Sequence, residues 1–313
     1  MITKPFVLLG ALLFSMTTAL AGEKTVTPSQ GVRLTGLRAS HTFKVTLHQS
    51  DDARRNGVRL TIDERLEPYL IATVSGGILR LGFEELPKEL RNTDKWSCPA
   101  TAEVTLSRIN RLAVSGMASI HTDDTFSGTA SQIDASGMGQ IDPITIAVTG
   151  NGTPEIGVSG MGRIDVTLRN PVARMKIDAS GMSRFRLTHD AKSDDTKINA
   201  SGKGEIDLTL QETGSMTLHA SGMATITADG QTERLEAATS GQARLELGDM
   251  TIVEADCEAT GMSSIVCRVT QGIDASASGT SSIRIVADRA IRINTQTTAM
   301  AKVQQDKAEI HLK

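Results

Sequence analysis

The sequence predicts an all-β fold, a single-stranded parallel β-helix (solenoid) of about ten coils with ~20 residues each. Three observations predict it. A short motif around a glycine recurs along most of the chain, apolar residues alternate with polar ones on both sides of that glycine, and aromatic residues make up only 3% of the composition. A conventional core in a chain of this length normally contains more large rings.

The repeat is illustrated by residues 177–185, Ile-Asp-Ala-Ser-Gly-Met-Ser-Arg-Phe, and its copies lie 18 to 23 residues apart. The recurring glycines are Gly116, Gly137, Gly160, Gly181, Gly202, Gly222, Gly241, Gly261 and Gly279. A tenth, degenerate copy at 295–303 carries Ala299 in place of the glycine.

Alternation around each glycine indicates strands. The residues four and two positions before the glycine are mostly apolar, as is the residue four positions after it. Such a period-two pattern means a strand with one buried face, and a unit this short must stack on its neighbours to bury it. The glycine fits a sharp bend with positive φ, which the preceding hydroxyl can hydrogen-bond. Gly128, outside the motif, is expected in a loop.

An antiparallel propeller or sandwich is the alternative fold. Propeller blades need about 40 residues, roughly twice the spacing seen here. Hairpin signals of the Asn-Gly type occur at Asn56-Gly57 and Asn151-Gly152, both outside the repeated units. The spacing therefore favours the β-helix.

The region before Gly116 is less regular. Alternating stretches at 43–47, 58–62, 71–74 and 78–81 predict strands, and residues 84–100, with two prolines and the single Trp, predict a long excursion. We expect an N-terminal cap and irregular first coils over 22–105, and regular coils with a C-terminal cap over 106–313. Residues 30–313 would form one structural domain, with 290–313 capping its far end because terminal repeats are usually atypical.

Residues 1–21 have the pattern of a signal peptide. Lys4 is a positive n-region, Phe6 to Leu13 an apolar stretch, and Ala19-Leu20-Ala21 a small-x-small cleavage signal. A membrane anchor is the alternative, but the apolar stretch is short for one. No apolar run reaches ~18 residues, so we expect no transmembrane segment in the mature chain. The sequence predicts an exported protein, periplasmic or extracellular.

Charge excludes one class of partner. The formal net charge is −3, with 22% charged residues spread along the chain, so no basic footprint for nucleic acid is present.

With these motifs in view, the chain resembles a bacterial family known as the auto-transporter adhesin head domain, or GIN-type domain. Serial S-G-x-(G/A/S)-x-I motifs after a short strand region and a signal peptide carry the resemblance, over about residues 36–305. The resemblance implies a parallel β-helix at or outside the cell envelope. It implies no measured activity and no catalytic residues.

Methionine is concentrated in one column of the repeat. The residue directly after the glycine is a methionine in seven of ten copies, interrupted by Lys203, Gln242 and Thr280. The methionines are Met117, Met138, Met161, Met182, Met223, Met262 and Met300. Alternation places the column outward or at a corner, where stacked methionines would form a flexible apolar stripe suited to a partner. Ordinary packing over the bend is the alternative.

Charged residues also recur at fixed positions. Three residues after the glycine stand Arg163, Arg184 and Glu205, and five after it stand Asp165, Arg186 and Asp207. Neighbours of opposite sign one coil apart should form cross-strand pairs on a solvated face.

Metal and cofactor signals are missing. Of Cys98, Cys257 and Cys267, the last two bracket one repeat, so a disulfide between them or two small buried thiols are both open. Three Asp-Asp pairs, at 51–52, 123–124 and 194–195, would suit calcium in loops, but no EF-hand ligand series accompanies them. The six His residues show no zinc spacing. We expect no metal and no cofactor.

The function predicted is a non-enzymatic exported β-helix that serves as a cell-envelope structural or adhesin-like binding module. Its partner would be an envelope protein or glycan of unknown identity, and self-association into a homo-oligomer is open. The alternative is a carbohydrate-active β-helix enzyme, a polysaccharide lyase or hydrolase. Its carboxylate pair would be Asp165/Asp207 or Asp134/Asp178, yet the repeats lack Trp and Tyr faces for sugars and no catalytic Ser or Cys arrangement appears.

Overall fold

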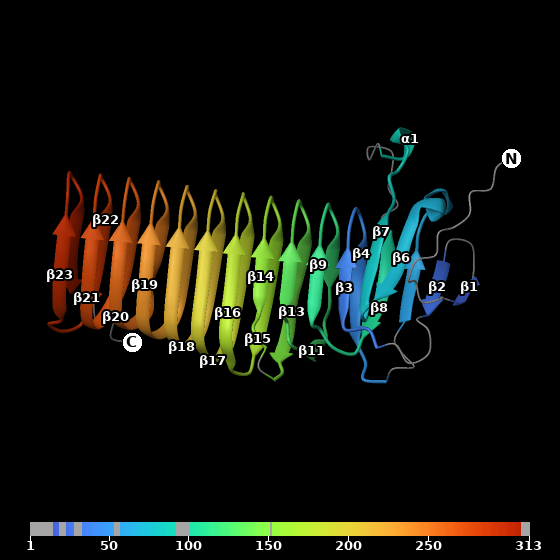
Figure 1. The fold of residues 1–313 in the computed structure, drawn as a ribbon, viewed down its shortest axis with the longest axis horizontal. Coiled ribbons are helices and arrows are strands. Elements are labelled where there is room, and N and C mark those ends of the chain that lie inside the picture. Colours follow the sequence, from blue (N-terminus) through green and yellow to red (C-terminus); the bar gives the residue numbers. More distant parts are fainter. Residues whose placement is uncertain are drawn as a thin grey trace.

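A straight rod of stacked coils forms the protein (Figure 1). The computed structural model describes residues 15–18, 23–27, 33–52, 57–91, 100–150 and 152–307, and forms a β-solenoid of about ten turns. The predicted fold class is confirmed. Each coil runs along one sheet to a sharp bend, returns along a second sheet, and curves back more gradually at the opposite edge.

The strands before each bend form one continuous parallel sheet, which we call the pre-bend sheet. It contains β9 (Arg111–Val114), β12 (Gln132–Ala135), β14 (Glu155–Val158), β16 (Val172–Ala179), the second halves of β17 (Arg184–Ala200), β18 (Glu205–Ala220), β19 (Thr225–Thr239), β20 (Arg244–Ala259) and β21 (Ser264–Ala277), and β23 (Arg292–Thr297).

The strands after each bend form the post-bend sheet. It contains β10 (Ser119–His121), β13 (Gln140–Val148), β15 (Arg163–Arg169), the first halves of β17 to β21, β22 (Ser282–Ala287) and β24 (Lys302–Lys307). The short strand β11 (Thr125–Gly128) adds a further pairing to β13.

The bends stack directly on one another. Each of the nine glycines has φ between 68° and 79°, a region that side chains with a Cβ rarely adopt. From Met138 onward, the residue after each glycine donates its backbone N–H to the glycine carbonyl of the preceding coil, as Met182 does to Gly160 at 2.7 Å, while Met117 donates to the His41 carbonyl. A Cβ built on Gly181 would lie 2.5 Å from that same carbonyl oxygen. The bend column is therefore both left-handed and closely packed.

The core consists of aliphatic columns inside the rod. Ile133, Ile156, Ile177 and Ile198 follow one another in register, and each is at most 2% exposed. Alanines such as Ala179 and Ala200 fill the narrow space beside the bend. Stacking thus buries the face that a single coil could not cover.

The N-terminal end is closed by antiparallel strands. The parallel stack includes β3 (Gly36–Ala39), β4 (Lys44–Gln49), β7 (Ile78–Phe83) and β8 (Thr101–Leu106), with His41 at the bend position (φ 65°). Antiparallel to it lie β5 (Gly57–Thr61) and β6 (Leu70–Ser75). The strands predicted at 43–47, 58–62, 71–74 and 78–81 are thereby confirmed.

The 84–100 excursion and the signal segment are described in part. The chain after β6 and β7 includes α1 (Lys88–Arg91), while η1 (Glu64–Tyr69) precedes β6. Trp96 and Cys98 lie outside the described residues, as do 1–14 and 19–21 of the predicted signal peptide. Within that segment, β1 (Ser15–Thr18) pairs antiparallel with β2 (Glu23–Thr27), and β2 pairs with β5. Removal of residues 1–21 would therefore take one edge strand and leave the β2–β5 pairing in place.

The last coil has the geometry of the others but a different interior. Inward positions that carry Ala275, Ala277 and Ile285 in the preceding coil carry Thr295, Thr297 and Gln305 in β23 and β24. Polar residues at these positions allow a terminal coil to face solvent, as a capping repeat requires.

The expectation that Gly128 lies in a loop was wrong. Gly128 is buried at the end of β11, and a Cβ there would overlap the backbone carbonyl of Ile109. Its neighbours in sequence showed a loop-like composition, but the close approach of another strand decides its environment.

Candidate binding surface

The methionines of the repeat form an exposed ridge along the edge of the rod where the bends lie, at the top of Figure 1. Their exposed fractions range from 45% at Met117 to 73% at Met300. By contrast Met175, Met216 and Met250 are buried in the core, at 2% or less. We call the exposed set the methionine ridge: Met117, Met138, Met161, Met182, Met223, Met262 and Met300.

The bend itself aims these side chains outward. Because the glycine reverses the chain and the next backbone N–H bonds the coil below, the side chain after the glycine cannot turn into the core. Methionine is unbranched and polarisable, so a row of such side chains can adapt to an apolar or mixed partner surface. Exposed large apolar side chains gathered in one line are unusual on a monomer.

A groove runs beside the ridge on the pre-bend sheet. Its floor is the column of hydroxyl residues directly before the bend glycines. Its wall is the outward column of residues three positions before the same glycines. One stretch, of about 770 Å³, runs from Arg38 and Arg80 to Ser180, and a second, of about 550 Å³, runs from Asp178 to Thr260. The two stretches share Asp178 and Ser180, so the groove extends along most of the rod.

A hydrogen-bonded chain of three side chains forms part of that wall. Asn199 donates through Nδ2 to the Asp178 carboxylate at 2.7 Å, and its Oδ1 lies 3.3 Å from His219 Nδ1. Lys176 Nζ is 2.7 Å from the same carboxylate. Burial opposes ionisation of Asp178, but the hydrogen bonds from Lys176 and Asn199 outweigh it and hold its pKa below the usual value. Asp178 is therefore a fixed negative charge at the centre of the groove.

Asp134 has a different environment in the same column. Burial raises the pKa of the Asp134 carboxyl, against the opposing hydrogen bond from Gln132 at 2.6 Å. Gly157, the residue between Asp134 and Asp178 in the column, has no side chain, and the Asp134 carboxylate leans over it. The two carboxylates thus stand two coils apart, as the sequence predicted.

The charged columns of the post-bend sheet pair within the chain. Arg184 Nε lies 2.9 Å from Glu205, and Arg186 Nη1 lies 3.4 Å from Asp165. These two predicted cross-strand pairs are confirmed, while Arg163 and Arg184 are register partners of the same sign. Asp165 and Asp207 flank Arg186 at two coils' separation, in a hollow of about 230 Å³.

The acidic loops come together in part. The Gln49 backbone N–H donates to Asp124 at 2.7 Å, and its side chain donates to Asp51 at 3.1 Å. In the part of the chain that the structure describes, no three His, Cys, Asp or Glu side chains are placed to hold a metal. Cys257 and Cys267 are both buried free thiols.

Sequence reasoning named Asp178 but missed Asn199 and His219, its neighbours in the wall of the groove. All three stand three residues before a bend glycine, so reading that position down the repeat would have found them. The positions three and five residues after the glycine were read in this way, and the corresponding pairs were found. The two columns differ in their contacts: the post-bend charges form ion pairs between coils, while Asp178, Asn199 and His219 form a hydrogen-bonded chain.

Fold and surface define an elongated β-solenoid with long repeated outer columns. Residues 33–160 and 153–288 match the family described as "Putative auto-transporter adhesin, head GIN domain". Because these segments cover more than half of the chain, the protein belongs to that family. In the described residues no helix is long and apolar enough to cross a membrane.

Solved structures share the fold at low identity. A crystal structure described as a putative adhesin from Parabacteroides distasonis ATCC 8503 is 15% identical with a TM-score of 0.50, covering 94% of this chain and 97% of its own. Another, described as a putative adhesin from Parabacteroides merdae ATCC 43184, is 14% identical with a TM-score of 0.49, covering 91% and 95%. No curated protein matches the chain. The first likeness shows the fold alone.

Proposed function

We propose that the protein is an exported, non-enzymatic binding module of the cell envelope, and that the methionine ridge is its contact surface. The observation that carries the proposal is that the exposed large apolar side chains of the described residues are the seven methionines on one edge of the rod. Membership of an adhesin-type family and the signal-peptide pattern of residues 1–21 support it. The partner is an envelope protein or glycan, contacted in the periplasm or outside the cell.

The groove beside the ridge gives that surface a polar border. Hydroxyls such as Ser180 and the fixed charge of Asp178 lie within it, next to the apolar row of side chains. Interfaces commonly combine an apolar strip with a rim that makes directional hydrogen bonds. A long partner lying along the rod would meet both.

The carboxylate pairs proposed for an enzyme have structural partners. Asp165 is paired with Arg186, and Asp178 is held by Lys176 and Asn199. A reducing-end release assay across acidic and neutral polysaccharides, with and without calcium, should detect no turnover. Turnover that Asp165→Asn or Asp178→Asn abolishes would replace the binding module with a carbohydrate-active enzyme.

The ridge is tested by co-sedimentation of the labelled chain with isolated bacterial envelopes. Changing Met138, Met161 and Met182 to Gln should weaken binding at least tenfold, since three consecutive coils lose their apolar contact. The matched control replaces the ridge's three polar interruptions, Lys203→Ala, Gln242→Ala and Thr280→Ala, at the same kind of bend. Equal loss in both variants, or none in the first, would contradict the proposal, provided both melt like the parent chain.

A further inference from the structure

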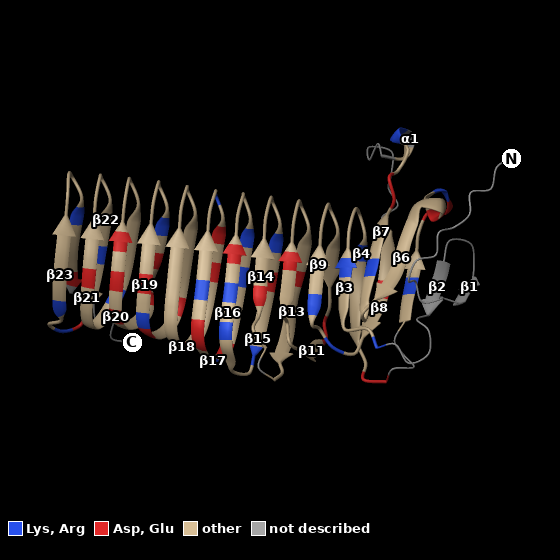
Figure 2. Cartoon of the chain, in the orientation of Figure 1, with Lys and Arg blue, Asp and Glu red and all other residues tan. Residues whose placement is uncertain are grey.

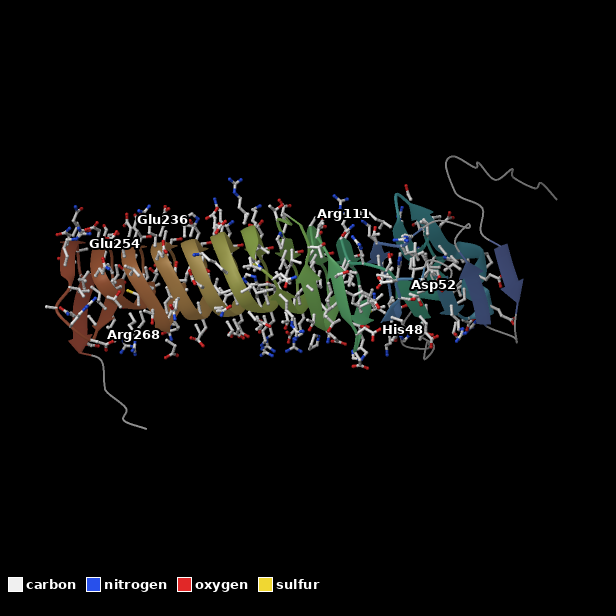
Figure 3. The ribbon with its side chains drawn as sticks, turned by 90° about the horizontal axis from the view of Figure 1, so that it is seen from below. His48, Asp52, Arg111, Glu236, Glu254 and Arg268 are labelled. Atoms are coloured by element: carbon white, nitrogen blue, oxygen red, sulfur yellow. The ribbon has the colours of Figure 1, made fainter. Side chains whose placement is uncertain are left out.

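Both sheets of the rod carry ion pairs, and they differ in how their remaining charges are distributed along the rod. On the post-bend sheet, ion pairs within the chain join Arg184 to Glu205, Arg186 to Asp165 and Arg284 to Asp306. On the pre-bend sheet, ion pairs join Lys176 to Asp178 and Arg292 to Glu254, while the outward columns three and five positions before the bend carry basic residues near one end and acidic residues near the other. Figure 3 shows Arg111, Glu236 and Glu254 projecting from the same side of the rod, with Arg268 and His48 on the opposite side.

The pre-bend sheet continues beyond β9 through β3 and β7, and this N-terminal end is basic. Arg80 on β7 and Arg38 on β3 are register partners, so two positive side chains stand one strand apart on the same face (Figure 2). Arg111 on β9, next to β3, adds a third. Among the described residues no carboxylate lies within ion-pair distance of these three arginines, although Asp134 interacts with Arg38 and Arg111 at longer range. Like charges placed this way destabilise a sheet unless an anion meets them.

The other end of the same sheet is acidic. Glu236 on β19, Asp256 and Glu258 on β20, and Asp274 on β21 all point outward and are exposed. Glu236, Asp256 and Asp274 follow one another in register, again with like charges on neighbouring strands. Figure 2 shows the corresponding red bands at the end of the rod opposite to the blue bands of β3 and β7.

A two-fold axis along β16 would place the basic cluster of one copy against the acidic cluster of another. Along the sheet the order is β7, β3, β9, β12, β14, β16, β17, β18, β19, β20, β21. Strands at equal distances from β16 on its two sides would face each other in two copies related by this axis. Thus β3 of one copy would face β20 of the other, and in the same way β9 would face β19, β12 would face β18 and β14 would face β17. In the outward columns this pairs Arg38 with Glu258, Arg111 with Glu236, and Glu155 with Lys197.

The same axis would also bring small residues and titratable residues of the two copies together. Ala113 on β9 meets Ala238 on β19, and Asp134 on β12 meets His219 on β18. The two stretches of groove also lie on either side of the axis, because the residues they share, Asp178 and Ser180, lie at the end of β16. At the axis itself like charges meet, Asp178 with Asp178 and Lys176 with Lys176, and the two grooves face each other, so the complementarity lies in the charge pairs on either side of the axis.

We infer that two copies of this chain associate through their pre-bend sheets as an antiparallel dimer with its two-fold axis along β16. The strip from β7 to β21 is roughly 50 Å long and 14 Å wide, about 700 Å² on each copy, close to the ~800 Å² per partner of a standard interface. Every charge pair named above occurs twice. Since the axis runs parallel to the strands, both methionine ridges project on the same edge of the dimer, side by side.

This inference goes beyond the proposed function and does not rest on it. A dimer would bury the groove between its two copies and leave both ridges exposed, so that the ridges alone, without their polar border, contact an envelope surface at two places with the gain that multivalency brings. A chain that binds envelopes as a monomer would contradict the dimer alone. A dimer with no envelope binding would contradict the function alone.

The test exchanges the charges of one pair. Arg38→Glu places two repulsive Glu–Glu contacts in its own dimer, and Glu258→Arg places two repulsive Arg–Arg contacts in its own. A mixture of the two variants forms a heterodimer in which both contacts are again of opposite sign. Sedimentation velocity over a concentration series should give the parent chain about twice its 33.2 kDa, each variant alone at least tenfold weaker dimerisation, and the mixture restored dimers.

Two controls distinguish the proposed contacts from a general effect of charge. Arg163→Glu changes the charge by the same amount on the post-bend sheet and should leave the dimer unchanged. Raising the salt concentration should weaken the parent dimer, since its contacts are screened. A monomeric parent chain, variants that dimerise like the parent, or a mixture that stays monomeric would each overturn the inference. So would saturable binding of an acidic polysaccharide at Arg38 by a parent chain that stays monomeric.

Discussion

Gly181 lies directly over Gly160: a Cβ on Gly181 would come within 2.5 Å of the Gly160 carbonyl oxygen, which already accepts the backbone N–H of Met182. The glycine at this bend is therefore required for two separate reasons. Its φ of 79° disfavours any residue with a Cβ, and the coil below leaves no room for one. The stacking of the whole rod depends on this contact, because it recurs at each regular coil.

Three glycines separate those two reasons experimentally. Gly181→Ala should lower the free energy of unfolding by at least ~2 kcal/mol, since strain and overlap add. Gly150→Ala, at φ 67° with nothing within 4 Å of its Cβ position, should cost about 1 kcal/mol from the backbone alone. Gly248→Ala, which meets only a side chain at 3.7 Å, should be neutral within ~0.5 kcal/mol.

Chemical denaturation of the three variants gives the ranking. Equal unfolding free energies for Gly181→Ala and Gly248→Ala would show that the stacked bends carry no special requirement. Gly128→Val is unsuitable as a tolerant control, because Gly128 itself packs against Ile109.

His189 makes the stability of the rod sensitive to acid. Its ring lies on β17 between Leu168 and Leu210 in register, its Nε2 donates to the Asn170 carbonyl at 3.1 Å, and its buried Nδ1 has no partner in the described residues. Burial lowers the pKa of His189, although Asn170 and Asp190 oppose the shift. The imidazole is therefore neutral in the folded chain and protonates more readily when unfolded.

The sign of the effect follows from linkage. The stability that neutral His189 provides is complete above its unfolded pKa near 6.5 and is lost as the pH falls through the lower folded pKa. His189→Leu should flatten the loss of unfolding free energy below pH 6.5, while His48→Gln, at an exposed site, should not. His41, whose pKa burial also lowers, contributes equally to all three proteins. Identical pH profiles for His189→Leu and the parent would contradict this assignment.

The two core cysteines should be inert in the folded chain. Cys257 on β20 and Cys267 on β21 are fully buried, and the Cys267 hydrogen bond together with burial raises the pKa of the Cys257 thiol. Only the thiolate reacts, so a maleimide reagent should label neither residue until the chain is unfolded. Mass spectrometry of Cys98→Ser protein checks this without interference from the third cysteine. Labelling of Cys257 in native buffer would contradict the buried placement.

Much of the fold followed from residue spacing alone. Alternation around Gly181 and its counterparts predicted the strands, and the spacing of the copies predicted one coil for each. The position of Gly128 did not follow, because its environment is set by Ile109, a residue that the repeat pattern does not include. Local patterns determine which residues point inward, while contacts between irregular segments depend on the assembled rod.

Less of the surface than of the fold could be predicted from the sequence. The pairs Arg184–Glu205 and Arg186–Asp165 were predictable because the two members of each occupy one column in consecutive coils. The relation between Arg38 and Glu258 was not, since Arg38 precedes the regular repeat and reaches its column only through the β3–β9 pairing. A charge pattern that spans the rod becomes visible only when the irregular first coil is placed in register.

The central claim is that the methionine ridge is the surface that meets the partner, and methyl NMR of methionine tests it most directly. Ten methionines follow residue 21, seven on the ridge and three, Met175, Met216 and Met250, in the core. On titration with isolated envelopes, the signals of ridge methyls such as Met138, Met161 and Met182 should broaden and shift, while the three core signals stay unchanged. Envelope binding that leaves the ridge signals unchanged, or that alters core and ridge alike, would contradict the account.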